Sequence, residues 1–234
     1  MGVPAMSPLP SQLKQALVNC DALVVEADIT LPFSPQSLPQ EPVIPLTEQL
    51  NEEQWQTFDK ICQECRLNSH DLVKFPAWQV GLTLQQKQAY LLGLRPEFGI
   101  DHQLLTLAHQ CNQSIITLET PEQQLALLTE LPDQGLPLLI DSLAHWRKNA
   151  RQLQQMIDWW LTKSHSSDSP LPSLSRGFSH PLHQRLIVQR NQQWAAHLLQ
   201  LPAGRYLVAV GALHLTGPHN LIELIHSPSA RTLL

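Results

Sequence analysis

Three side chains that can bind a metal ion or move a proton stand at the ends of short apolar runs in this sequence. They are Glu26, Glu119 and His214, and Gly211 and Gly217 flank the histidine. Carboxylate oxygens and an imidazole nitrogen suit Mn, Zn or Co, and a metal with an open coordination position activates water. An imidazole can also move a proton without a metal. The pattern therefore predicts a metal centre or a general-base centre.

Each of these residues also has a purely structural explanation. His214 could be a core histidine satisfied by a backbone carbonyl, and Glu26 could be an ion-paired or helix-capping carboxylate. Glu119 directly precedes Thr120-Pro121, which is typical of a helix start, and a negative charge there stabilises the helix by itself. The functional interpretation therefore requires that the three side chains meet.

Arg190 is a fourth candidate, on a predicted helix and followed by Asn191. A buried arginine can hold a carboxylate through two hydrogen bonds or neutralise an oxyanion. An ordinary ion pair on an amphipathic helix would explain the same residue, and spacing alone does not separate the two interpretations.

Cys62 and Cys65 form a Cys-x-x-Cys motif on another predicted helix. No second such motif and no nearby histidine pair completes a zinc site. The motif also does not open a helix after a strand, as a thioredoxin-like redox site does. We expect two half-buried thiols on one helix face.

Three short apolar strands must position the candidate residues, over 22–26, 114–119 and 205–210. Their continuous apolar character predicts strands that are buried on both faces. If the strands are parallel, their carboxyl ends meet at one edge of the sheet, where α/β proteins place their chemistry. We expect an α/β fold with a small mixed or parallel sheet.

Helices are predicted over much of the remaining sequence. We expect a single domain over 1–234 with a large helical insertion at about 46–98, and a flexible Ser/Pro-rich loop at 164–179. Long helices are expected over 136–163 and 181–200.

The sequence also predicts the N-termini of two helices. Asn51 and Gln54 form a capping box, and Asp101 is the expected N-cap of a helix that runs through Cys111.

Composition limits the classes of partner. The 234 residues are 43% hydrophobic and 15% charged, with a net charge of −5, and no stretch is rich in Lys or Arg. This balance predicts a folded protein whose main partner is neither nucleic acid nor an anionic membrane. No apolar stretch is long enough to span a bilayer. The N-terminus lacks signal-peptide features, so the chain as written is expected to be cytoplasmic, unless an upstream segment directs export.

Five segments together resemble the TraB/GumN family, particularly its YbaP-like branch. In order they are Leu23-Val-Val-Glu26-Ala-Asp28, Gly99-Ile-Asp101, Leu118-Glu119-Thr-Pro-Glu-Gln-Gln124, Arg190-Asn191-Gln-Gln-Trp194 and Val210-Gly211-Ala-Leu-His214-Leu-Thr-Gly217. The resemblance implies a fold similar to that of erythromycin esterase and ChaN-like proteins.

The resemblance implies a metal-dependent hydrolase, because the family includes the Tiki-type proteases. It would make Glu26 and His214 active-site residues, with Arg190 as a supporting charge. In such a hydrolase His214 would be a metal ligand and Glu26 a ligand or general base, and Arg190 would stabilise the oxyanion or hold Glu26 in place. The residue pattern adds Glu119 as a further possible ligand. Mn, Co or Zn would be the cofactor, and a peptide or small molecule the substrate. Family members are also linked to control of plasmid conjugation, including pheromone shutdown.

One departure from the family pattern concerns the first of its two Gly-x-x-His motifs. That motif normally precedes a Met-Gly pair, which corresponds here to Met1-Gly2, with Ser7-Pro-Leu-Pro10 behind it. We therefore expect the first histidine and its strand to be missing, through a misassigned start codon or a shortened gene. This departure favours a rival hypothesis, a non-catalytic peptide-binding or conjugation-regulatory protein. A third hypothesis is a metal-free esterase with His214 as base. The oligomeric state is left open.

Overall fold

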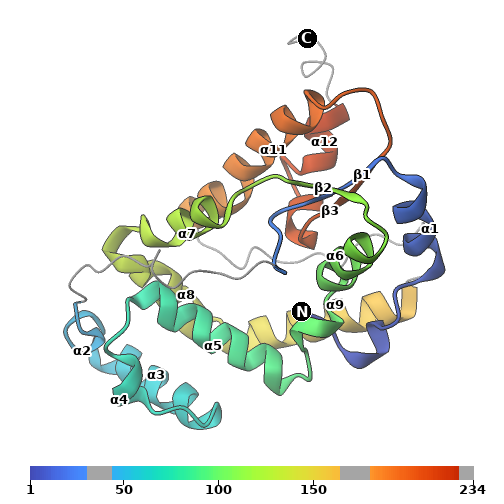
Figure 1. Ribbon diagram of the computed structural model, residues 1–234. Coiled ribbons are helices and arrows are strands. Elements are labelled where there is room, and N and C mark those ends of the chain that lie inside the picture. Colours follow the sequence, from blue (N-terminus) through green and yellow to red (C-terminus); the bar gives the residue numbers. More distant parts are fainter. Residues whose placement is uncertain (31–43, 164–179, 227–234) are drawn as a thin grey trace.

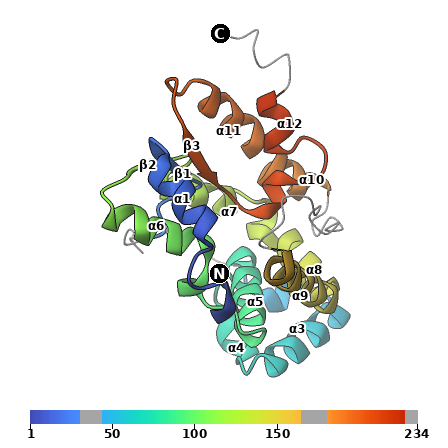
Figure 2. The ribbon, with the colours of Figure 1, turned by 90° about the vertical axis from the view of Figure 1, so that its right-hand side faces the viewer.

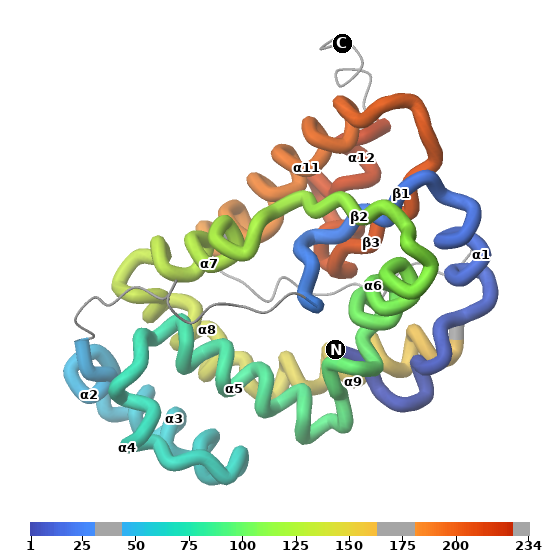
Figure 3. The backbone as a smooth tube through the Cα atoms, viewed as in Figure 1, coloured from blue at the N-terminus to red at the C-terminus, as the bar shows by residue number. Residues whose placement is uncertain are grey.

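A three-stranded parallel sheet lies in the upper half of the computed structural model as drawn in Figure 1, and the structure describes residues 1–30, 44–163 and 180–226. The strands are β1 (Ala22–Val25), β2 (Ser114–Thr117) and β3 (Tyr206–Ala209), in the order β2-β1-β3. The expected α/β fold with a small parallel sheet is confirmed. Figure 3 shows the C-terminal strand returning to lie beside β1, near the start of the chain.

The three strands end at the same level of the sheet. Val25 is paired with Thr117 on one side and with Ala209 on the other, and both pairings are parallel. The residues that follow the strands therefore emerge at the same edge of the sheet, which brings together segments far apart in the sequence.

Helices cover both faces of the sheet (Figure 2). Leu23 and Val25 of β1 pack against α1 (Ser11–Asn19) and α6 (Ile100–Gln110). Val24 points to the opposite face and packs against α11 (Gln189–Leu199) and α12 (Leu221–His226). Successive side chains of a strand point to opposite faces, so the continuous apolar sequence of β1 fits burial on both sides.

The prediction that all three strands are buried is wrong for β2 and β3. All four residues of β1 are buried, whereas those of β3 are half-buried and Ser114 and Thr117 of β2 are exposed. Within the described residues, β2 and β3 each pair on one side only. An apolar run has the same appearance in a central strand and in an edge strand, so the sequence does not separate them.

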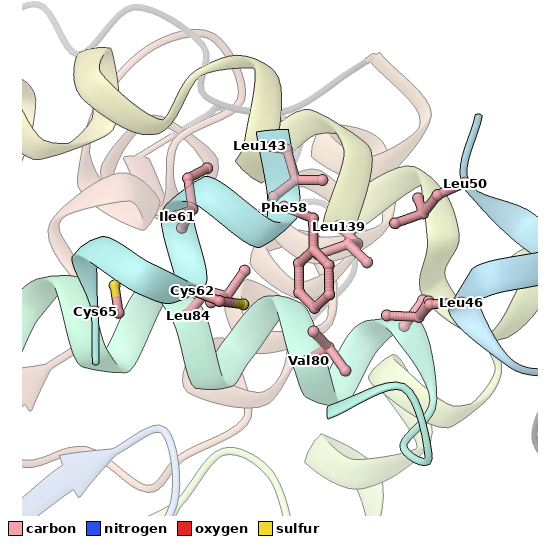
Figure 4. Close-up of a cluster of buried hydrophobic side chains, with 11 residues drawn as sticks. Leu46, Leu50, Phe58, Ile61, Cys62, Cys65, Val80, Leu84, Leu139 and Leu143 are labelled. Carbon is pink, nitrogen blue, oxygen red and sulfur yellow. The ribbon is translucent and has the colours of Figure 1, made fainter. Parts of the chain in front are cut away.

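The helices between β1 and η3 form a second core. They are α2 (Leu46–Gln49), α3 (Glu52–Glu64), α4 (Ser69–Leu72) and α5 (Ala77–Leu91), followed by the 3-10 turn η3 (Pro96–Phe98). Phe58 of α3 is packed among Val80, Leu84 and Leu139 (Figure 4). The capping box of Asn51 and Gln54 at the start of α3 is confirmed. That the chain forms one domain with an insertion here stays a prediction.

Cys62 and Cys65 belong to this second core and are fully buried rather than half-buried (Figure 4). Burial raises the pKa of the Cys62 thiol to about 12. A buried thiol with a raised pKa is not a nucleophile at neutral pH. The motif is therefore part of the apolar core.

The remaining helices differ from prediction in three places. The expected helix over 136–163 is divided into α8 (Leu136–Ala144) and α9 (Trp146–Lys163) by His145, whose φ of −108° and ψ of 14° leave the helical region. A break of one residue barely disturbs apolar spacing, so the sequence pattern does not reveal it. Gly99 rather than Asp101 is the N-cap of α6.

The third difference is in the predicted helix over 181–200. It consists of α10 (His180–His183), a π-helical turn (Gln184–Val188) and α11. The other elements are η1 (Pro4–Met6), α7 (Pro121–Thr129), η4 (Pro132–Gly135) and η6 (Ala212–Leu215). The predicted loop at 164–179 lies outside the described residues. None of the helices in the described ranges is long and apolar enough to cross a membrane.

Candidate functional site

Glu26 and Glu119 lie side by side because the pairing of β1 with β2 continues beyond the strands. The amide of Leu118 donates to the carbonyl of Val25 at 2.9 Å, and the amide of Glu119 donates to the carbonyl of Glu26 at 2.9 Å. Parallel pairing places both side chains at the same edge of the sheet. Glu119 is 7% exposed, whereas the side chain of Glu26 is 26% exposed.

His214 reaches the same edge through a turn after β3. Gly211 ends the extended segment, and its carbonyl accepts a hydrogen bond from the amide of His214 at 2.9 Å within η6. The amide of Gly211 donates to Oε1 of Glu26 at 2.7 Å. A Cβ at position 211 would lie 3.1 Å from that oxygen, so the glycine permits this close approach.

Arg190 lies at the centre of these three side chains. Its Nε donates to Oε1 of Glu119 at 2.6 Å and its Nη2 donates to Oε2 of Glu119 at 2.8 Å, a two-point contact with one carboxylate. The same Nη2 donates to Oε2 of Glu26 at 2.8 Å, and Nη1 is 3.3 Å from Nε2 of His214. Burial opposes the charge on Arg190, but hydrogen bonds and charge from Glu119 and Glu26 outweigh it and raise the pKa of Arg190. The guanidinium is therefore a fixed positive charge.

The helix that carries Arg190 widens just before it. A π-helical turn precedes α11, and Nη1 of Arg190 also donates to the carbonyl of Leu186 at 3.2 Å. Turns of this kind occur mostly as single insertions in α-helices, and often at functional sites.

Trp194 supports the cluster from the next turn of α11. Its ring lies 4.6 Å from the guanidinium carbon of Arg190 and 4.3 Å, between centroids, from the ring of His214. Its indole Nε1 donates to Oε1 of Glu119 at 3.0 Å. Residues four apart share a helix face, so the spacing of Arg190 and Trp194 brings both side chains to the sheet edge.

Asn191 determines which ring nitrogen of His214 carries the proton. The amide group of Asn191 donates to the carbonyl of His219 at 2.9 Å, which leaves its Oδ1 to accept from Nδ1 of His214 at 2.7 Å. In a neutral imidazole the other nitrogen is an acceptor, so Nε2 accepts from Arg190. Burial, and then the positive charge of Arg190, lower the pKa of His214 to about 4.

We expect His214 to remain neutral under mildly acidic conditions. In the unfolded chain a histidine has a pKa of about 6.5. Between that value and about 4 the unfolded chain binds the additional proton, so acidification through this range removes stability. NMR titration of the imidazole signals, with His214 assigned from their loss in a His214→Gln variant, measures the midpoint directly. A midpoint at or above pH 6.5 would contradict the buried neutral imidazole.

Asp101 contributes a further negative charge near this edge. It lies in the first turn of α6, and its pKa is raised by crowding of the carboxyl group by protein and by the charge of Glu26.

The donor types at this edge suit Mn, Co or Zn, but their arrangement does not. Oε2 of Glu26, Oε2 of Glu119 and Nε2 of His214 all face the terminal nitrogens of Arg190. The guanidinium occupies the place that a shared ion would need. No group of three or more His, Cys, Asp or Glu residues in the described ranges is arranged to hold a metal ion.

The four residues predicted from the sequence, Glu26, Glu119, Arg190 and His214, are brought together in one cluster. Two contributors were not predicted. The sequence places Asn191 beside Arg190 and Trp194 at the end of the same family-like segment, but assigns neither of them a role in the site. The four-residue spacing of Arg190 and Trp194 was the available signal.

Comparison with known proteins identifies relatives of this chain. A model of the TraB/PrgY/gumN family matches residues 1–229. The proteins named "Uncharacterized protein YbaP" from Escherichia coli (strain K12) and from Shigella flexneri are each 45% identical to the chain over 227 residues. The match covers 96% of this chain and 84% of each relative. No solved structure is significantly similar. The resemblance predicted from the five sequence segments is confirmed, and the chain belongs to the TraB/PrgY/gumN family.

Proposed function

We propose that this chain is a hydrolase that cleaves a peptide-type bond at the carboxyl edge of its sheet. The observation that supports this proposal is the convergence of three strand ends on one guanidinium. Glu26, Glu119 and His214 follow three different strands and all contact Arg190. Reactive groups of α/β proteins commonly gather at this edge.

Glu26 is the base in this proposal because it is the member of the cluster most open to water. Its carboxylate takes a proton from the attacking water, whose oxygen adds to the carbonyl carbon of the substrate. The positive charge of Arg190 stabilises through space the negative charge that develops on the carbonyl oxygen, because its five N–H groups already donate within the protein. His214 orients Arg190 through Nε2. The carbon–nitrogen bond then breaks, and the proton passes from Glu26 to the leaving amine.

The metal-dependent form of this hydrolase, expected from the family resemblance, would take Glu26, Glu119 and His214 as ligands. With Arg190 in contact with all three, that ligand set does not fit an ion, so the roles above are assigned to side chains alone. Addition of Mn, Co or Zn is therefore part of the activity test.

We expect Glu26→Gln to lower the rate of peptide cleavage by roughly 10²–10⁴-fold, the usual contribution of a general base. Cleavage of a mixed peptide library, followed by mass spectrometry with and without Mn or Co, measures this rate. The control for Glu26→Gln is Glu223→Gln, at an exposed residue of α12. The control for a His214→Ala variant is His197→Ala, at an exposed residue of α11. Equal cleavage by wild type and His214→Ala would contradict the proposal.

A second candidate is a non-catalytic peptide-binding or conjugation-regulatory protein. Internal hydrogen bonding favours it, because both nitrogens of His214 and both oxygens of Glu119 already have partners in the cluster. Such a satisfied network is also typical of a structural role. A peptide that is bound and released intact by wild type would support this candidate against the hydrolase.

A further inference from the structure

We propose that the cation of this centre is Arg190 itself, and that its guanidinium and a divalent metal ion exclude each other. The metal expected from the family resemblance would then bind only where Arg190 has been removed or displaced.

Geometry supports this assignment directly. The three atoms that would coordinate a metal are each within 3.3 Å of a terminal guanidinium nitrogen, at 2.8, 2.8 and 3.3 Å. An ion that contacted all three would have to overlap with Arg190. The imidazole offers its lone pair to Arg190 because its other nitrogen is held by Asn191.

Repulsion between two cations supports the same conclusion. The guanidinium is already paired with both Glu26 and Glu119, at 2.8 and 2.6 Å. A divalent ion added beside the guanidinium would repel it at short range. That repulsion is weakly screened, because the side chains of Arg190 and Glu119 are only 12% and 7% exposed.

Departure of Arg190 is opposed by contacts outside the cluster. Its guanidinium lies over the ring of Trp194 and donates to the carbonyl of Leu186. Glu119 would lose its two-point partner while remaining buried. The guanidinium is therefore a component of the folded structure rather than a mobile side chain that yields to an ion.

Titration of the full chain with Co²⁺ tests the proposal without reference to activity. Calorimetry measures stoichiometry, and the visible spectrum of bound cobalt reports its coordination. We expect wild type to show no more cobalt uptake than a Glu26→Gln/Glu119→Gln variant, which controls for binding by exposed histidines. We expect Arg190→Ala to bind one additional equivalent and to gain thermal stability on adding cobalt.

Arg185→Ala is the matched control for Arg190→Ala. Arg185 lies on the same helical segment but pairs with Glu130 instead of the cluster, so its removal should create no cobalt site. Stoichiometric cobalt uptake by wild type that is lost in Glu26→Gln/Glu119→Gln would overturn the proposal. A folded Arg190→Ala variant that takes up no additional cobalt would overturn it as well.

If Arg190→Ala does not fold, the cobalt titration of wild type decides alone. Cobalt uptake at Glu26 and Glu119 contradicts the proposal, and no uptake there supports it. Neither measurement depends on cleavage of a peptide bond. Failure of the proposed hydrolase function would therefore leave the assignment of the cation intact.

Discussion

Replacement of Arg190 by methionine is expected to lower the free energy of unfolding by about 3–5 kcal/mol. Methionine retains much of the side-chain volume but leaves Glu119 buried without its two-point partner, and Glu26 without its ion pair. Removal of one member of a buried ion pair is costly because the remaining charge has neither water nor a counterion. Urea unfolding followed by circular dichroism measures the change.

Two variants separate this charge effect from a general loss of packing. Glu119→Gln in the Arg190→Met background should recover part of the lost stability, since a neutral amide can still accept from the indole of Trp194. Arg185→Met removes a more exposed pair with Glu130, whose side chain is 67% exposed, and should cost less than about 1 kcal/mol. Equal losses for Arg190→Met and Arg185→Met would show that the cluster is not a buried ion pair.

Trp194→Ala is expected to lower the free energy of unfolding by roughly 3–5 kcal/mol, the usual cost of emptying a large aromatic site. Trp194 is 1% exposed and packs with Val24 and Leu221 on the face of the sheet that α11 covers. The variant also removes the ring under Arg190. Peptide cleavage should fall with it, because Arg190 loses a contact that holds its guanidinium in place.

Trp194→Phe tests how much of the lost stability comes from ring packing and how much from the hydrogen bond of the indole. Phenylalanine keeps a ring for packing but not the indole donor to Glu119, so we expect a loss of about 1–3 kcal/mol, between wild type and alanine. Leu91→Ala, at a side chain that is 59% exposed at the end of α5, should stay within about 0.5 kcal/mol of wild type. A Trp194→Ala loss no larger than that of Leu91→Ala would contradict the role of this ring.

Much of the fold was predictable because its signals are local. The apolar run before Glu26, the capping box at Asn51 and the Thr120-Pro121 helix start each lie within a few residues, and all three are confirmed. The break at His145 and the π-helical turn before Arg190 were not predicted. Both change the backbone over one turn or less while leaving the apolar spacing nearly unchanged.

The sequence by itself determined the family, the α/β class, and the four side chains that could meet at the end of a parallel sheet. Only the tertiary structure decided that β3 pairs on one side alone among the described residues, that Trp194 belongs to the site, and that Arg190 lies among the expected ligands. Arg190 is 164 residues from Glu26 and 71 from Glu119 in sequence. Spacing along the chain describes how a residue sits on its own helix or strand. Which charge it meets depends on how separate elements pack, and that packing made a guanidinium the partner of both carboxylates.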